Sequence, residues 1–184
     1  MKNSIKIFLA VTLLFSLTAL AQEKEDYSKE PGFVDFGNLS PYLNSDKVTE
    51  VNIEGYLLKM VSNLTQKDDP ELSRMLKGLK LIKVYSFEVN VKEAKELNVK
   101  ISQIDNLLAE KNWDRIVKVK GPKESTNVYI KTSADKKEIV GLVVTELEKN
   151  GQSSFINIVG KIDMDALARL GEKFDIPSLD KVHK

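Results

Sequence analysis

The sequence contains no cysteine and only one histidine, and these two absences remove several classes of chemistry. Without cysteine there is no disulfide, no cysteine nucleophile and no cysteine-ligated metal. A bacterial lipoprotein signal also needs a cysteine at its cleavage site, so lipid attachment of that kind is excluded. The histidine, His183, is the second residue from the end and lies in a polar segment. We therefore expect no Ser-His-Asp or Cys-His arrangement and none of the common zinc sites.

The chain also lacks a strong excess of charge and the common nucleotide-binding motifs. Its formal net charge is +1, and removal of a signal containing Lys2 and Lys6 leaves 26 basic against 27 acidic residues. A near-neutral chain has no bulk electrostatic reason to bind nucleic acid, so we expect no nucleic-acid partner. Neither G-x-x-x-x-G-K-[ST] nor G-x-G-x-x-G occurs, so no cofactor is predicted.

Carboxylates are the remaining candidates for catalysis. The local clusters are Asp68 with Asp69, Asp163 with Asp165, and Asp135 with Glu138. Hydrolysis by a glycosidase mechanism needs two carboxylates that face each other across a cleft, which neighbours in sequence do not establish. Each cluster is better explained as a helix cap or a turn, so we predict no catalytic residue, no metal ligand and no enzymatic activity.

The first 21 residues have the three parts of a cleavable secretory signal. Lys2 and Lys6 supply the positive region, residues 7–20 form an apolar run, and Ala19-Leu20-Ala21 is an A-x-A cleavage site. The apolar run has 14 residues, fewer than the roughly 18 to 20 that span a bilayer. We therefore expect cleavage near Ala21 rather than an uncleaved anchor, no transmembrane segment in the mature chain, and a periplasmic or secreted protein.

The rest of the chain divides into a flexible leader over 22–46, a single α+β domain over 47–175 and a polar tail over 176–184. Within the leader, Phe33, Phe36, Leu39 and Tyr42 are predicted to dock on the core as a loop or a helical turn. Hydrophobic periodicity predicts the order of the elements. The predicted strands cover residues 48–53, 79–89, 113–120, 126–132, 138–147 and 154–162. The predicted helices cover residues 54–64, 70–77 and 92–111, and a last helix starts after Asp163.

Four consecutive strands with short turns imply an antiparallel meander. The fold class is therefore predicted as α+β, with a mostly antiparallel sheet of about six strands and helices packed on one face. In the helix over 54–64 the apolar residues at helical spacing are Tyr56, Leu57, Met60, Val61 and Leu64.

A local excess of basic residues is the most suggestive charge feature. From Asp114 to Lys137, seven basic residues face three acidic ones, a net charge of +4. The basic residues are Arg115, Lys118, Lys120, Lys123, Lys131, Lys136 and Lys137. Two interpretations stay open. The hairpin contacts an anionic surface such as lipid headgroups or acidic glycan, or it is the solvated face of two strands in which lysine discourages edge pairing.

Three segments together suggest a family: residues 48–64, WDRIVKV at 113–119, and SFINIVGKIDMDALARL at 154–170. With the signal-like start, they resemble the DUF4252 family of exported Bacteroidetes proteins. The resemblance covers roughly residues 33–175 and is most specific in the closing segment. It implies a bacterial envelope protein. It supplies no catalytic residues, because the family has no established activity.

Three functions remain open at this point. The leading hypothesis is a non-enzymatic binding or protein-interaction module, whose partner is an unknown envelope protein or a second copy. The apolar strands over 139–147 and 154–162 are candidates for an exposed sheet edge that binds this partner. The alternatives are a carboxylate-based hydrolase acting on envelope polymers and a binder of anionic lipid or glycan that uses the 115–137 hairpin.

Overall fold

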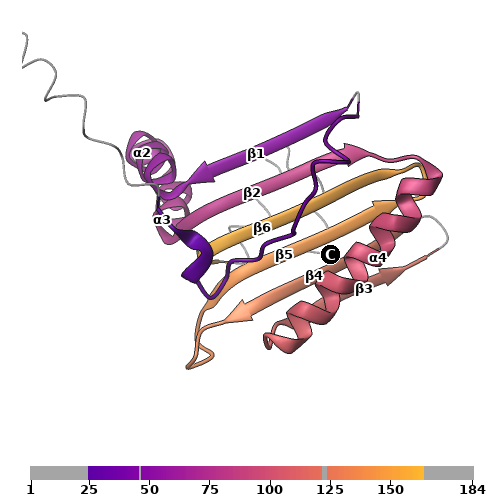
Figure 1. Ribbon diagram of the computed structural model, residues 1–184. Helices are drawn as coiled ribbons and strands as arrows, with labels where there is room; N and C mark the ends of the chain where they lie inside the picture. The colour runs from indigo at the N-terminus through magenta and orange to yellow at the C-terminus, as the bar shows by residue number, and fades with distance from the viewer. Residues whose placement is uncertain (1–24, 46, 122–123, 164–184) are drawn as a thin grey trace, which may run out of the picture.

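The computed structural model describes residues 25–45, 47–121 and 124–163, which form one open sheet with three α-helices (Figure 1). The strands are β1 (Val48–Glu54), β2 (Leu79–Glu88), β3 (Asp114–Lys120), β4 (Glu124–Thr132), β5 (Ile139–Glu148) and β6 (Gln152–Ile162). The helices are α2 (Gly55–Thr65), α3 (Pro70–Gly78) and α4 (Val91–Glu110), and a short 3-10 turn, η2, covers Tyr27–Lys29. The predicted order of elements is confirmed as far as β6. The predicted signal, last helix and tail lie outside the described residues.

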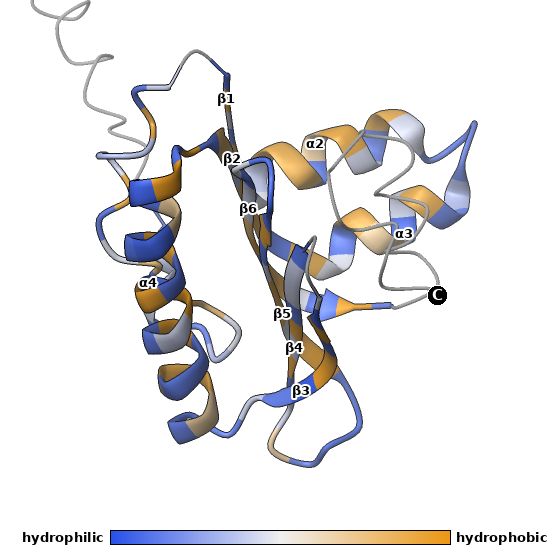
Figure 2. Ribbon diagram, turned by 90° about the vertical axis from the view of Figure 1, so that its right-hand side faces the viewer, coloured by the Kyte–Doolittle hydropathy of each residue, from blue (hydrophilic) through white to orange (hydrophobic). Residues whose placement is uncertain are grey.

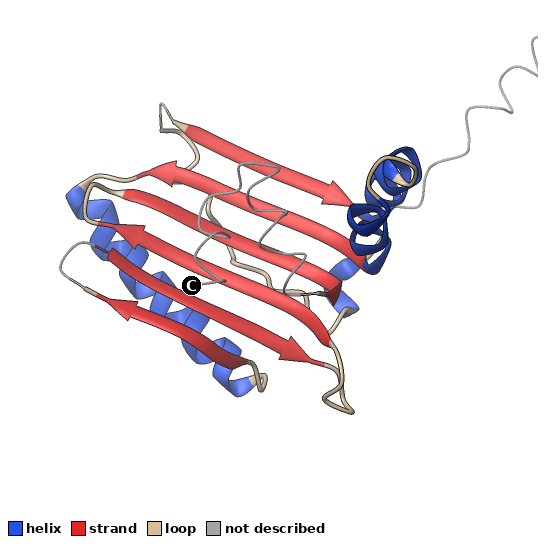
Figure 3. Ribbon diagram, turned by 180° about the vertical axis from the view of Figure 1, so that it is seen from behind, coloured by secondary structure: helices blue, strands red, loops and turns tan. Residues whose placement is uncertain are grey.

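The sheet is antiparallel throughout, in the order β1-β2-β6-β5-β4-β3. The meander and the α+β class are therefore confirmed. The strands that form the two edges are β1 and β3 (Figure 3). The prediction that the apolar strands β5 and β6 offer an edge is wrong, because both lie inside the sheet. Their long apolar runs reflect burial on two sides rather than an exposed edge.

The helices pack on both faces of the sheet, which corrects the prediction of one covered face (Figure 2). Helix α4 lies on one face and α2 with α3 on the other, and these are called here the α4 face and the α2–α3 face. Successive residues of a strand point to opposite faces, so Val144 of β5 belongs to the core under the α2–α3 face and Val143 to the core under the α4 face. Both faces are apolar in the central strands, and both have to be covered.

Local sequence signals fix the ends of the helices. The Asp69 side chain accepts a hydrogen bond from the backbone of Leu72, and Pro70 occupies the first turn of α3. Helix α4 begins with a capping box, in which Asn90 and Glu93 each accept from the other's backbone N–H. The β5–β6 turn contains Gly151 at φ +92°, a conformation that favours glycine.

Part of the predicted leader belongs to the core of the α4 face. Val34, Phe36 and Leu39 are each no more than 5% exposed. The ring of Phe36 meets the edge of Phe155 at 5.5 Å between centroids, and Tyr42 stacks on Phe87. The predicted docking of Phe36, Leu39 and Tyr42 is therefore observed. The assignment of the whole range 22–46 as flexible is wrong for these residues, because they pack in the same core cluster as Phe87 and Phe155.

Candidate functional site

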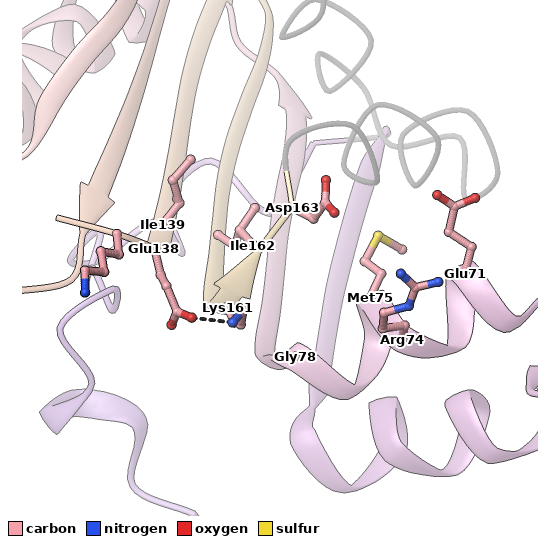
Figure 4. Close-up of a pocket in the computed structure, with 10 residues that line it drawn as sticks. Glu71, Arg74, Met75, Gly78, Glu138, Ile139, Lys161, Ile162 and Asp163 are labelled. Atoms are coloured by element: carbon pink, nitrogen blue, oxygen red, sulfur yellow. Dashed lines mark hydrogen bonds and ion pairs between the residues drawn. The ribbon is translucent and has the colours of Figure 1, made fainter. Parts of the chain in front are cut away.

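An open pocket of about 480 Å³ lies where the end of α3 meets the start of β5 and the end of β6 (Figure 4). Met75, Ile139 and Ile162 supply apolar lining. The charged residues around it are Glu71, Arg74, Lys137, Glu138, Lys161 and Asp163. Among these described lining residues acidic and basic side chains are equal in number, so together they carry no net charge that would select a ligand of one sign.

The pocket is held together by contacts between strands and helix. Lys161 of β6 donates to the carboxylate of Glu138, which precedes β5, and this ion pair joins the two strands. Behind it, Gly160 adopts φ +123° and approaches so closely that an added Cβ would lie 2.5 Å from the carbonyl oxygen of Gly78. Glycine is therefore required at residue 160, where β6 approaches the end of α3.

The chemistry of this lining is limited to charge and apolar contact. The described residues that line it include no histidine, serine, threonine or tyrosine, so these residues supply no imidazole base and no hydroxyl nucleophile. Of its carboxylates, Glu138 is engaged by Lys161. The arrangement can bind an amphipathic group, but the described lining offers no nucleophile with an adjacent base.

The seven basic residues predicted as one anionic-surface contact are separated in the structure. Lys118 and Lys120 are exposed on β3. Lys136 and Lys137 are exposed in the turn that follows β4, at the opposite end of the β3–β4 hairpin. Lys123 lies outside the described residues. Among the described residues, the exposed lysines therefore lie at the two ends of the hairpin and not in one patch.

Three of the basic residues have partners within the domain. The Lys131 ammonium donates to the carbonyl oxygens of Lys111 and Asn112, at 2.5 Å and 3.1 Å, directly after the end of α4. A cation at this position stabilises the helix by meeting its unsatisfied carbonyls. Lys137 lies 3.9 Å from Asp135 in an exposed ion pair. Arg115, the third, contacts Tyr129.

Tyr129 is a buried ionisable residue in the core of the α4 face. It is 3% exposed, and burial is the main reason that its pKa rises to about 12. The nearby carboxylate of Asp105 raises the pKa further, whereas the Arg115 guanidinium opposes the shift. Arg115 donates to the Tyr129 hydroxyl at 3.3 Å and lies over its ring. The phenol is thus kept neutral and structural rather than poised as a base near neutral pH.

An exposed apolar ridge runs along α2, and it is the surface feature that sequence reasoning missed. Tyr56, Met60 and Leu64 are 47%, 51% and 75% exposed. Spaced four residues apart, they lie on one side of the helix, and we call them the α2 ridge. The opposite side of α2 packs through Leu58 and Ser62, and the Ser62 hydroxyl donates to the backbone of Ser73 in α3 at 2.8 Å.

The signal for the α2 ridge is present in the sequence. Helix α2 has one charged residue, Lys59, in eleven, and its apolar residues extend around more than one side. Helical spacing identified the apolar residues of this helix, Tyr56, Leu57, Met60, Val61 and Leu64. It gave no means of deciding which side of the helix faces the sheet.

Residues 25–45, 47–121 and 124–163 contain no group of three or more histidine, aspartate or glutamate side chains placed to hold a metal ion. Within the same ranges, no helix is both long enough and apolar enough to cross a membrane.

The fold and the surface define a small α+β domain on one open antiparallel sheet, with a mixed-charge pocket and an exposed apolar helix ridge. The chain belongs to the family of the domain of unknown function DUF4252, whose model matches residues 42–170. The family membership suggested by the sequence is thereby confirmed. No curated protein and no solved structure matches the chain.

Proposed function

We propose that this protein is a non-enzymatic protein-interaction module of the bacterial cell envelope, and that the α2 ridge is the surface that binds its partner. The observation that carries the proposal is the exposure of Tyr56, Met60 and Leu64 along one side of α2. Single exposed apolar residues are normal on a protein surface, but a contiguous set is typical of an interaction site.

The composition of the ridge suits protein recognition. Tyrosine and methionine are enriched in protein interfaces, and methionine adapts its shape to the surface that it meets. Covering each of these half-exposed side chains contributes on the order of 1 kcal/mol to binding. With one charge in the helix, Lys59, burial of α2 carries little cost from desolvating charged groups. A partner with an apolar groove fits this surface best.

The two alternative functions have weaker support. A carboxylate-based hydrolase needs two carboxylates facing each other across a cleft, and in the described pocket Glu138 is already engaged by Lys161. An anionic lipid or glycan binder would need a concentrated basic surface, whereas Lys118 and Lys137 lie at opposite ends of one hairpin. The envelope location rests on the signal-like first 21 residues and on the family resemblance.

The proposal is tested by capture from intact cells that produce a tagged full chain, after chemical crosslinking. The test variant is Y56Q/M60Q/L64Q, since glutamine keeps helix propensity and removes the apolar surface. The matched control is V91Q/V99Q, which removes exposed apolar side chains from α4 that are 80% and 60% exposed.

We expect wild type and the α4 control to recover the same envelope protein, and the α2 variant to lose it. The purified pair should then bind directly, with the affinity reduced at least about tenfold by the α2 substitutions. Equal recovery by all three proteins would overturn the assignment of the α2 ridge. Recovery of the protein alone from every sample would overturn the interaction module itself.

A further inference from the structure

The two edge strands of the sheet carry opposite charges on the same face. On β1, Glu50 is aligned with Tyr85 of β2 and through it with Phe155 of β6, in the core of the α4 face. Glu54 lies on the same side of β1. On β3, Lys118 is aligned with Asn127 of β4. Asn127 is aligned with Thr145 of β5, and Thr145 with Phe155 of β6, so Lys118 also lies on the α4 face. The α4 face therefore ends in carboxylates at one edge and in ammonium groups at the other.

The opposite face ends in apolar side chains at both edges. Val51 and Ile53 of β1 are half-buried and pack against the core of the α2–α3 face. Val117 and Val119 of β3 lie on that same face, and Val117 is aligned with Val128 in its core. Residues 50–54 of β1 and 117–120 of β3 thus alternate apolar residues on the α2–α3 face with polar or charged residues on the α4 face.

The directions of the two edge strands also match. Five successive antiparallel pairings separate β1 from β3, so the two strands run in opposite directions. A second copy with its β1 beside β3 of the first therefore continues the antiparallel alternation, and each face of one sheet continues into the same face of the next. In the described part of the chain, β1 and β3 each pair with one strand only.

We infer that β1 of one copy pairs with β3 of another, so that the protein associates with itself head to tail. The register with Val51 opposite Val119 places Glu50 opposite Lys120. The irregularity between Arg115 and Val117 then brings Arg115 opposite Glu54. Lys118 then faces Asn52, and Ile53 faces Val117. Apart from the pair of Asn52 and Lys118, the facing residues from 50 to 54 are opposite charges or apolar pairs, which is the arrangement that stabilises a sheet.

The same edges disfavour the other possible pairings. If β3 paired with β3 of a second copy, the lysines at 118 and 120 would face lysines and repel each other. If β1 paired with β1, the carboxylates of Glu50 and Glu54 would face carboxylates and repel each other in the same way. Lysines on an edge strand protect it against copies of itself, but not against an acidic edge. When β1 of one copy pairs with β3 of another, each dimer still has one unpaired β1 and one unpaired β3. Further copies can add at these edges, so the assembly is an open chain or a closed ring.

The absence of cysteine allows a direct test of the register. V51C and V119C are made as separate proteins, and neither is expected to form a disulfide-linked dimer alone. Mixing them under mild oxidation should give a crosslinked dimer. Mixing V51C with K118C is the control, because the residue at 118 points to the other face. Failure of the V51C and V119C mixture to exceed this control would overturn the inference.

A charge exchange tests the mechanism by sedimentation velocity at low and high salt. Wild type should form larger species that dissociate as salt screens the charges. E50K and K120E, which reverse the two charges of one facing pair, should each weaken association at least about tenfold, and an equimolar mixture of the two should restore it. The controls E96K/E110K and K92E/K95E change exposed charges on α4 and should associate as wild type does. A wild type that stays monomeric at every concentration, or a mixture that restores nothing, would overturn the inference. The α2 ridge is not part of this contact, so either proposal can fail alone.

Discussion

The side-chain amide of Asn157 holds Val34 against the centre of the sheet, although 123 residues separate them in the sequence. Its oxygen accepts from the Val34 backbone N–H at 2.9 Å. Its nitrogen donates to the carbonyl oxygens of Gly32 and Leu142, at 2.9 Å and 3.1 Å. Asn157 is fully buried, and this set of bonds satisfies an amide that would otherwise be costly to bury. Asn157 therefore attaches the N-terminal segment to the α4 face.

Replacement of Asn157 should release that segment. Asn157→Ala leaves the Val34 N–H and the Gly32 carbonyl without their partner, so we expect a loss of about 2–4 kcal/mol in the free energy of unfolding. Urea unfolding measures the loss, and trypsin should cleave faster after the exposed Lys29. Asn106→Ala, on the exposed side of α4, is the control. Similar stabilities for the two variants would show that Asn157 does not anchor the segment.

The contact between Gly32 and Gly141 should tolerate no side chain. A Cβ on Gly32 would lie 2.0 Å from the carbonyl oxygen of Val140, so Gly32→Ala must push the N-terminal segment away from β5. We expect a loss of roughly 2 kcal/mol or more, measured by thermal or urea unfolding. Gly121→Ala is the matched control, because its Cβ would meet the nearest atom at an ordinary 3.8 Å. Equal stability of the two alanine variants would contradict the close approach.

Tyr129 should make the folded state sensitive to alkaline pH. Its pKa rises from 10.0 to about 12 on folding, mainly through burial, so folding favours the neutral phenol. The stabilisation is complete below pH 10 and is lost as the pH rises towards about 12. The free energy of unfolding should therefore fall less steeply over this interval in Tyr129→Phe than in wild type. Parallel profiles for the two proteins would show that Tyr129 titrates as a free tyrosine does.

The cap of α4 should contribute measurably to stability. The Asn90 side chain accepts from the backbone N–H groups of Lys92 and Glu93, both at 3.0 Å. We expect Asn90→Ala to cost about 1 kcal/mol and Asn90→Gly only a few tenths of that. Urea unfolding of both variants distinguishes the cap from a general effect of substitution. A larger loss for glycine than for alanine would indicate that helix propensity, rather than the cap, decides stability here.

The elements of this fold were predictable because their signals are local. Helix α4 follows from the spacing of Leu97, Ile101, Ile104 and Leu108, all buried as the spacing requires. The position of β6 between β2 and β5 was not predictable. It depends on pairings such as that between Val84 and Ile156. These residues lie far apart in the sequence, and their pairing produces no periodic pattern in it.

The candidate surfaces were less predictable than the fold. Helical spacing identified Met60 as apolar but could not show which side of α2 faces the sheet. Counting charges grouped Lys131 with the other basic residues, although the structure uses it to meet the carbonyls at the end of α4. Exposure and partnership depend on the three-dimensional arrangement, so residue type alone predicts neither.

The central claim is that α2 binds a protein partner, and a photo-activated crosslinker placed at a single residue tests it most directly. The probe replaces Met60, at the middle of the α2 ridge, or Val99, which is 60% exposed on α4. Irradiation of intact cells should give a discrete crosslinked species from position 60 and none from position 99. The absence of a specific product at position 60, or the same products from both positions, would contradict the account.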